Sequence, residues 1–270
     1  MINIKNFKKL DQPYPIAIID NFFDDNDLNK ITNEFPSFDA FIKFKKTMVN
    51  RRILSNENPD FYKFIEKNKS WIKFYEIINS QNFFYKILKI LVENNSHEYK
   101  KFLELNFNKE FNQKKKIRFN LFFYFRELIQ KIPRNIFTNY FRHQIKKILY
   151  KKNDGQNNFY LRFDISSASN GYKRTPHTDS DGTLIAFLIY LEDKSEIGGS
   201  GGNFIINDNN HNNVREIEPK KNRAIFFLSN KNSLHSVSEM KNALGWRKFV
   251  YGGFTSVDKL IWSKINNKTN

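Results

Sequence analysis

The spacing of apolar residues changes along this chain, from a helical period of about four to an alternation with a period of about two. Beyond residue 158 the apolar runs are short, and loops rich in Gly, Asn, Asp and Ser separate them. These runs predict strands at 160–165, 184–191, 203–206, 223–228, 235–237 and 247–251. Many short strands with no long helix between them indicate an antiparallel jelly roll or barrel rather than a parallel α/β sheet.

The N-terminal part of the chain is dominated by helix signals. A β-branched run at 15–20 predicts a strand that leads into a helix capped by Asp24 and Asp25 and running to Phe35. A brief strand is predicted at 51–54. Pro59 suits the first turn of a helix that continues to about residue 78. Ser80 is then predicted to cap a further helix.

Two segments follow before the strand-rich part. The apolar pattern of 117–125 slightly favours a strand, although a helix fits the same residues, and 133–149 predicts a helix. The polar loop 151–158, which contains Gly155, is the clearest boundary. These signals predict an α+β chain in three parts: a strand and helix part at 1–58, a largely helical insertion at 59–155 and a jelly-roll core at 156–270.

Composition limits the classes of protein. A chain of 270 residues with 40% hydrophobic content can bury a large core. It contains no cysteine, which excludes disulfides, thiolate zinc sites and a cysteine nucleophile. We expect a reducing compartment, the cytoplasm, because the N-terminus also lacks a signal-peptide pattern. The longest apolar stretch, 184–191, is far shorter than the ~20 residues that span a bilayer.

The chain is strongly basic, with a formal net charge of +17 that lies mostly in the first 155 residues. A basic surface attracts nucleic acid, anionic membranes or acidic substrates. The abundance of Asn, Ile, Phe and Lys is also typical of an A/T-rich genome, in which lysine accumulates on solvated faces without a partner. We favour this second interpretation.

Three residues form a candidate metal site. His177 and Asp179 are two apart, so in a strand both side chains project from one face while Thr178 points away. His235 must come from another strand, which a double-sheet roll can bring opposite this pair. Two imidazoles and one carboxylate with vacant positions are typical of non-haem Fe(II) oxygenases, whereas structural zinc prefers a closed, thiolate-rich set. Arg247 lies one predicted strand further on.

The segments around these residues follow one another in a characteristic order. After His177-Thr178-Asp179 come the following: Ile189-Tyr190-Leu191-Glu192, the glycine-rich connection Gly198–Gly202, Asn203–Ile206, Ile217–Lys220, Arg223–Phe227, Leu234–Val237 and Trp246–Phe249. From about residue 158 to 254 this series resembles the prolyl-hydroxylase-like branch of the Fe(II)- and 2-oxoglutarate-dependent dioxygenases. The segment 15–35 also looks like the strand and helix that open many of these enzymes. The resemblance implies a double-stranded β-helix (jelly-roll) core.

The resemblance also implies roles for the residues. His177, Asp179 and His235 would be the iron ligands, and Arg247 would bind the distal carboxylate of 2-oxoglutarate. A guanidinium suits this task, because it forms bidentate bonds with a carboxylate and keeps its charge when buried. Lys248 is the alternative cation, but as the next residue in a strand it should face outward.

Three further residues are candidates for contacts with ligands. Similar enzymes often place co-substrate contacts on the strand that precedes the iron pair, which predicts a role for Tyr160 and Arg162; packing and surface exposure are the respective alternatives. Arg174, just before the iron pair, is predicted to meet an anionic substrate at the mouth of the site. An exposed loop charge is its alternative interpretation.

The family it resembles couples the oxidative decarboxylation of 2-oxoglutarate by Fe(II) and O2, which yields succinate and CO2, to oxidation of a substrate. Asp179 favours hydroxylation, or desaturation or cyclisation by the same oxidant, because related halogenases lack this carboxylate. Gly252 and Gly253 stand where nucleic-acid demethylases carry a further arginine, which argues against nucleic acid as substrate. We therefore predict a hydroxylase of a peptide side chain or small metabolite. The alternative is a basic nucleic-acid- or polyanion-binding protein with a non-catalytic barrel.

Overall fold

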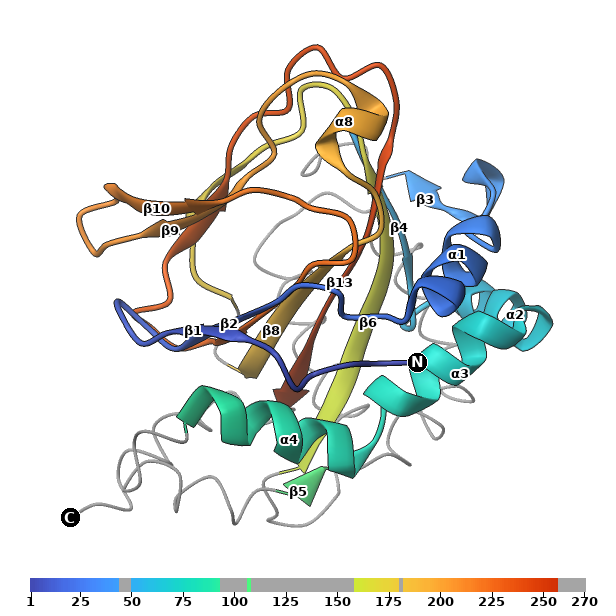
Figure 1. The fold of residues 1–270 in the computed structure, drawn as a ribbon, viewed down its shortest axis with the longest axis horizontal. Helices are drawn as coiled ribbons and strands as arrows, with labels where there is room; N and C mark the ends of the chain where they lie inside the picture. The colour runs from blue at the N-terminus through green and yellow to red at the C-terminus, as the bar shows by residue number, and fades with distance from the viewer. Residues whose placement is uncertain (44–49, 93–105, 108–157, 180–181, 257–270) are drawn as a thin grey trace, which may run out of the picture.

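The computed structural model describes residues 1–43, 50–92, 106–107, 158–179 and 182–256. Within these residues a large sheet and a small sheet face each other, and helices cover the outer face of the large sheet (Figure 1). All strand pairs are antiparallel except that of the short strand β5 with β6. This arrangement confirms the predicted α+β fold with a double-stranded β-helix core and N-terminal helices.

The large sheet has the order β1-β2-β11-β8-β13-β6-β4-β3, with β5 beside β6. Its strands are β1 (Lys8–Leu10), β2 (Ile16–Ile19), β3 (Ile42–Lys43), β4 (Arg51–Ser55), β5 (Asn106–Phe107), β6 (Asn158–Ala168), β8 (Thr183–Tyr190), β11 (Ala224–Leu228) and β13 (Arg247–Ser256). The predicted strands of this sheet are present, and β6 and β13 are longer than predicted. The N-terminal strands therefore belong to the same sheet as the core.

The small sheet has the order β10-β9-β12-β7. Its strands are β7 (Arg174–His177), β9 (Phe204–Asn207), β10 (Asn213–Ile217) and β12 (His235–Val237), and the one-turn helix α8 (Lys194–Ile197) precedes β9. Strand β10 was not predicted. Its first four residues are exposed, so it lacks the apolar alternation that marks a half-buried strand.

Four helices pack on the outer face of the large sheet. They are α1 (Asp25–Asn33), α2 (Pro59–Lys67), α3 (Lys69–Ile78) and α4 (Gln81–Val92). A 3₁₀ turn, η1 (Phe38–Ala40), follows α1. Ser80 caps α4 as predicted, because its Oγ accepts a hydrogen bond from the backbone N–H of Phe83 (3.2 Å). Asp24 does not cap α1 with its side chain; its carboxylate binds the N-terminal ammonium group instead (2.7 Å).

The prediction of a single helix from Pro59 to residue 78 is wrong, because the helix is interrupted at Asn68, between α2 and α3. Asn68 has an extended backbone (φ −121°, ψ 100°) and is both the C-cap of α2 and the N-cap of α3. Its side-chain amide donates to the carbonyl of Phe64 (2.7 Å). Asparagine competes in this way with helical hydrogen bonding. The helical spacing of apolar residues continues across this interruption, so the sequence pattern could not reveal where α2 ends and α3 begins.

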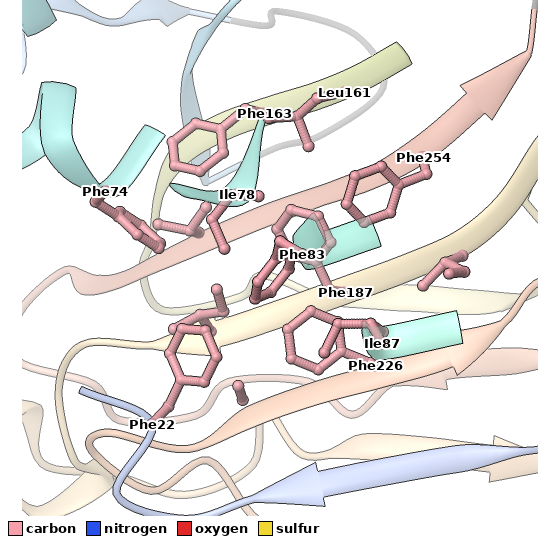
Figure 2. Close-up of a cluster of buried hydrophobic side chains, with 14 of the residues drawn as sticks. Phe22, Phe74, Ile78, Phe83, Ile87, Leu161, Phe163, Phe187, Phe226 and Phe254 are labelled. Carbon is pink, nitrogen blue, oxygen red and sulfur yellow. The ribbon is translucent and has the colours of Figure 1, made fainter. Parts of the chain in front are cut away.

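Strand β8 lies at the centre of the large sheet and is buried on both faces. Its residues alternate between two cores: Phe187 contacts the helices, whereas Leu188 and Tyr190 face the small sheet. Phenylalanines dominate the helix-side core, where Phe83 of α4 contacts Phe226, which in turn contacts Phe187 (Figure 2). Each fully buried side chain of this size contributes roughly 1.5–3 kcal/mol. The double burial explains why 184–191 is a continuous apolar run.

The segments 117–125 and 133–149, for which a strand or helix was predicted, lie outside the described residues. The division into 1–58, 59–155 and 156–270 stays a prediction. No helix in the described part of the chain is long and apolar enough to cross a membrane.

Candidate active site

The two histidines of the predicted triad lie opposite each other on neighbouring strands. His177 ends β7 and His235 begins β12, and the antiparallel register pairs them directly. Directly paired residues project from the same face of a sheet. Their ring centroids are 4.4 Å apart. The small sheet therefore brings both imidazoles to its inner face.

Asp179 reaches the same place by a different route from the one predicted. Strand β7 ends at His177, so Asp179 lies in the segment after the strand and strand alternation does not orient it. Its Oδ1 accepts a hydrogen bond from the hydroxyl of Tyr251, on β13 of the large sheet (2.9 Å). The three candidate ligand atoms of His177, Asp179 and His235 lie within 4.8 Å of one another.

Backbone carbonyls fix the tautomers of both imidazoles. Nδ1 of His177 contacts the carbonyl of Thr175 (2.8 Å), and Nδ1 of His235 contacts the carbonyl of Ser233 (2.9 Å). A carbonyl oxygen only accepts, so each Nδ1 carries a proton, and Nε2 is the nitrogen that holds the lone pair in the neutral ring. Burial and the neighbouring His235 lower the pKa of His177 to about 4. His177 is therefore neutral near pH 7, as a metal ligand must be.

The residues present fit a divalent iron. Oδ2 of Asp179 is buried and has no hydrogen-bond partner, and a metal ion bound to it would satisfy this oxygen. Two imidazole nitrogens and one carboxylate oxygen are the ligand set of non-haem Fe(II) oxygenases. His235 is held firmly for this role, since its ring stacks on Phe204 (5.5 Å) and meets the edge of Phe227 (4.8 Å).

Arg247 is a buried cation. It begins β13, is 2% exposed, and forms no ion pair with any carboxylate among the described residues. Its Nη2 donates to the carbonyl of Gly202 (3.1 Å), while its Nε has no partner. Burial lowers the pKa of this guanidinium, yet an arginine stays charged. An uncompensated buried charge costs several kcal/mol, so this position suits an anionic ligand.

Two features around Arg247 were missed in the sequence. The ring of Tyr190 lies beneath the guanidinium (5.6 Å), and Gly202, with φ +70°, leaves space that a Cβ atom would take from it. The glycine-rich connection thus leaves room for the guanidinium. The signal for Tyr190 was its parity in β8, which places it on the inner face with Leu188. Lys248 faces outward, as predicted, and pairs with Glu192 (2.7 Å).

Tyr160 and Arg162 share β6 but lie away from Arg247. Arg162 pairs with Gly253, six residues along β13 from Arg247, which corresponds to roughly 20 Å at about 3.3 Å per residue. Its guanidinium donates twice to Oδ2 of Asp164 (3.1 and 2.8 Å). The structure therefore does not bring these two residues together with Arg247, and their contact with a co-substrate stays a prediction.

Arg174 is turned toward the triad by an irregularity in β7. His177 pairs with His235 and Arg174 pairs with Val237, so three steps on β7 match two on β12. Such a bulge reverses the alternation of the strand. Arg174 therefore projects from the same face as His177. Its side chain has no hydrogen bond or ion pair within the described part of the chain, and the residue is half-buried.

The family model of the 2OG-Fe(II) oxygenase superfamily matches residues 163–256, which contain the triad and Arg247. Residues 163–256 of this chain belong to the 2OG-Fe(II) oxygenase superfamily. The oxygenase is an iron enzyme with a His-Asp-His triad as its candidate iron site and with 2-oxoglutarate as co-substrate. This family assignment confirms the resemblance seen in the sequence.

Several solved structures are similar to this oxygenase. A Pseudomonas putida prolyl-4-hydroxylase has 11% identity and a TM-score of 0.44, over 89% of this chain and 92% of its own. A Trichoplax adhaerens prolyl hydroxylase, in complex with a hypoxia inducible factor peptide fragment, has 11% identity and a TM-score of 0.40, over 94% and 87%. A prolyl 4-hydroxylase structure from Phytophthora capsici has 12% identity and a TM-score of 0.48, over 89% of this chain and 58% of its own. A search of curated proteins found no significant match.

Proposed function

We propose that this oxygenase is a hydroxylase that oxidises a peptide side chain or a small molecule and releases succinate and CO2. The proposal rests on two oriented imidazoles and a buried carboxylate oxygen in the same barrel as the buried guanidinium of Arg247. Neither that oxygen nor the guanidinium has an ionic partner among the residues that the structure describes. The imidazoles and the carboxylate suit Fe(II), and the guanidinium suits a dicarboxylate co-substrate.

Bound Fe(II), with 2-oxoglutarate and O2, would supply the oxidising chemistry. The protein groups bind and orient. His177, His235 and Asp179 would hold the metal, and the two histidines would bind through Nε2, because their Nδ1 atoms are engaged by backbone carbonyls. Arg247 would bind the distal carboxylate of 2-oxoglutarate, with the ring of Tyr190 excluding water from this ion pair.

An anaerobic titration tests this proposal directly. When Fe(II) and then 2-oxoglutarate are added to the protein without O2, we expect a visible metal-to-ligand charge-transfer band that saturates at one equivalent and disappears with a chelator. The band should also fail to form with succinate, which lacks the 2-oxo group. Absence of the band in the folded wild-type protein would contradict the proposal.

The position of Arg174 supports an anionic substrate. The bulge in β7 places this half-buried guanidinium on the face of the triad, and it has no counterion in the part of the chain that the structure describes. A charge-assisted hydrogen bond contributes about 1.5–3 kcal/mol. A substrate with a carboxylate or phosphate group would therefore gain roughly 10- to 100-fold in affinity over a neutral analogue.

Matched substrates and variants test this part of the proposal. We expect glutamate, aspartate or phosphoserine, free or in short peptides, to stimulate succinate release more than glutamine, asparagine or serine. Arg174→Gln should raise the KM for the best anionic compound roughly 10- to 100-fold, because it removes the charge-assisted bond. Lys173→Gln is the control, because that exposed neighbour pairs with Glu239 (3.3 Å). Equal effects of both variants, or a preference for the neutral compounds, would contradict an anionic substrate.

A further inference from the structure

The two oxygens of Asp179 have different surroundings. Oδ1 accepts the hydroxyl of Tyr251 (2.9 Å), whereas Oδ2 is buried with no hydrogen-bond partner. Asp179 lies beyond the end of β7, so no strand pairing holds its backbone in place. The bond from Tyr251 is the one side-chain hydrogen bond that Asp179 forms in the described part of the structure. The conformation of this carboxylate therefore depends on the large sheet opposite.

Tyr251 itself is held on several sides. It lies on β13 in the middle of the large sheet, where its backbone pairs with Asp164 on one side and Leu188 on the other (Figure 1). The guanidinium groups of Arg51 and Arg162 lie 5.3 Å and 5.4 Å from the centre of its ring. Asp164, which is fully buried, fixes Arg162 in turn. The hydroxyl is thus positioned without any help from a metal.

We infer that Tyr251 is a positioning residue that keeps Oδ1 of Asp179 occupied, so that Asp179 offers iron only Oδ2. The inference rests on the proposed function. Carboxylates bind metals through one oxygen or through both. An Asp179 that bound through both oxygens would take a position that the chelating co-substrate or O2 needs. Tyr251 therefore protects the open positions of the site as well as orienting the ligand.

Tyr251→Phe tests this role, because it removes one oxygen atom and keeps the ring between the two arginines. We expect the affinity for Mn(II), measured by calorimetry, to fall roughly 10- to 100-fold, as is typical when a partner of a metal ligand is lost. The affinity of the Co(II)-loaded protein for 2-oxoglutarate should fall as well, and the Co(II) absorption spectrum should change. These readouts do not require turnover.

Tyr75→Phe is the matched control. Tyr75 is also buried, at 7% exposed, but its ring packs against Phe61 and Phe163 on the helix side of the sheet. We expect this variant to bind Mn(II) like the wild type. Thermal unfolding of both metal-free variants separates a loss of fold from a loss of binding. If Tyr251→Phe loses its fold, 2-fluorotyrosine at position 251 replaces it, and its more acidic hydroxyl should alter the Co(II) spectrum.

The outcomes distinguish this inference from the proposed function. If wild-type protein binds neither Mn(II) nor 2-oxoglutarate, the proposed function fails. If wild-type protein binds both, and folded Tyr251→Phe binds them equally well with an unchanged Co(II) spectrum, only the role of Tyr251 is overturned. An unchanged Co(II) spectrum of the fluorotyrosine protein overturns it too.

Discussion

Replacing Arg247 by methionine is expected to lower the affinity for 2-oxoglutarate by roughly 30- to 5,000-fold. Removing one partner of a buried, hydrogen-bonded charge pair costs about 2–5 kcal/mol, because the remaining charge is left unpaired. Arg247 is 2% exposed and has no counterion within the described ranges, so the full effect should be seen. Calorimetry of the Mn(II)-loaded protein measures it, and the affinity for Mn(II) itself should not change.

The neighbouring Lys248 provides the control for this variant. Lys248→Met removes a cation from the next position of β13, but that side chain faces outward and pairs with Glu192. Its affinity for 2-oxoglutarate should equal that of the wild type. Gly202→Ala should lower the affinity for 2-oxoglutarate in the same way although Arg247 itself is kept, because the new Cβ atom would displace the guanidinium. If Arg247→Met binds 2-oxoglutarate normally, another cation binds the co-substrate.

Arg247→Met also has an expected effect on thermal stability. An unpaired buried charge destabilises the metal-free protein, and replacing such a charge by an apolar side chain of similar size is often neutral or stabilising. Metal-free Arg247→Met should therefore unfold at the same temperature as the wild type or at a higher one. This combination, lost binding with retained stability, is typical of a residue held for function.

The sequence revealed the main strands of the large sheet and the triad histidines because both depend on local patterns. Apolar alternation marks a strand, and His235 was expected on a strand separate from His177, as the pairing of β7 with β12 confirms. The role of Arg247 was predicted from the order of motifs that the chain shares with the family. The large sheet, with β8 buried on both faces, was predictable for the same reason, because burial on both faces leaves a continuous apolar run.

The sequence could not reveal what depends on contacts between distant segments. Asp179 was predicted to lie in a strand with His177, yet it is held from across the barrel by Tyr251, which is 72 residues away. The bulge that turns Arg174 inward follows from the pairing of β7 with β12, not from the residues of β7 alone. The break at Asn68 leaves the apolar period unchanged. Each of these depends on a partner that local periodicity does not encode.

Asp179→Ala is expected to abolish stable iron binding and succinate formation. The variant leaves only the two imidazoles, so it loses the one carboxylate and one of the three protein ligands that would hold the metal. The folded structure should survive, because Asp179 lies after a strand end and forms one side-chain hydrogen bond among the described residues. Iron content after anaerobic loading and desalting measures the first effect, and succinate release from 2-oxoglutarate measures the second.

Chemical rescue separates loss of a ligand from damage to the site. Alanine leaves space for a small carboxylate, and Tyr251 remains in place to donate to it, so millimolar formate should partly restore Mn(II) binding to Asp179→Ala. Asp60→Ala is the control: it removes an exposed carboxylate that pairs with Lys63 on α2, and its metal affinity should equal that of the wild type. Normal succinate release by Asp179→Ala would show that the triad is misassigned. Rescue by formate but not by methyl formate would show that the missing negative charge, rather than filled space, is what the metal requires at this position.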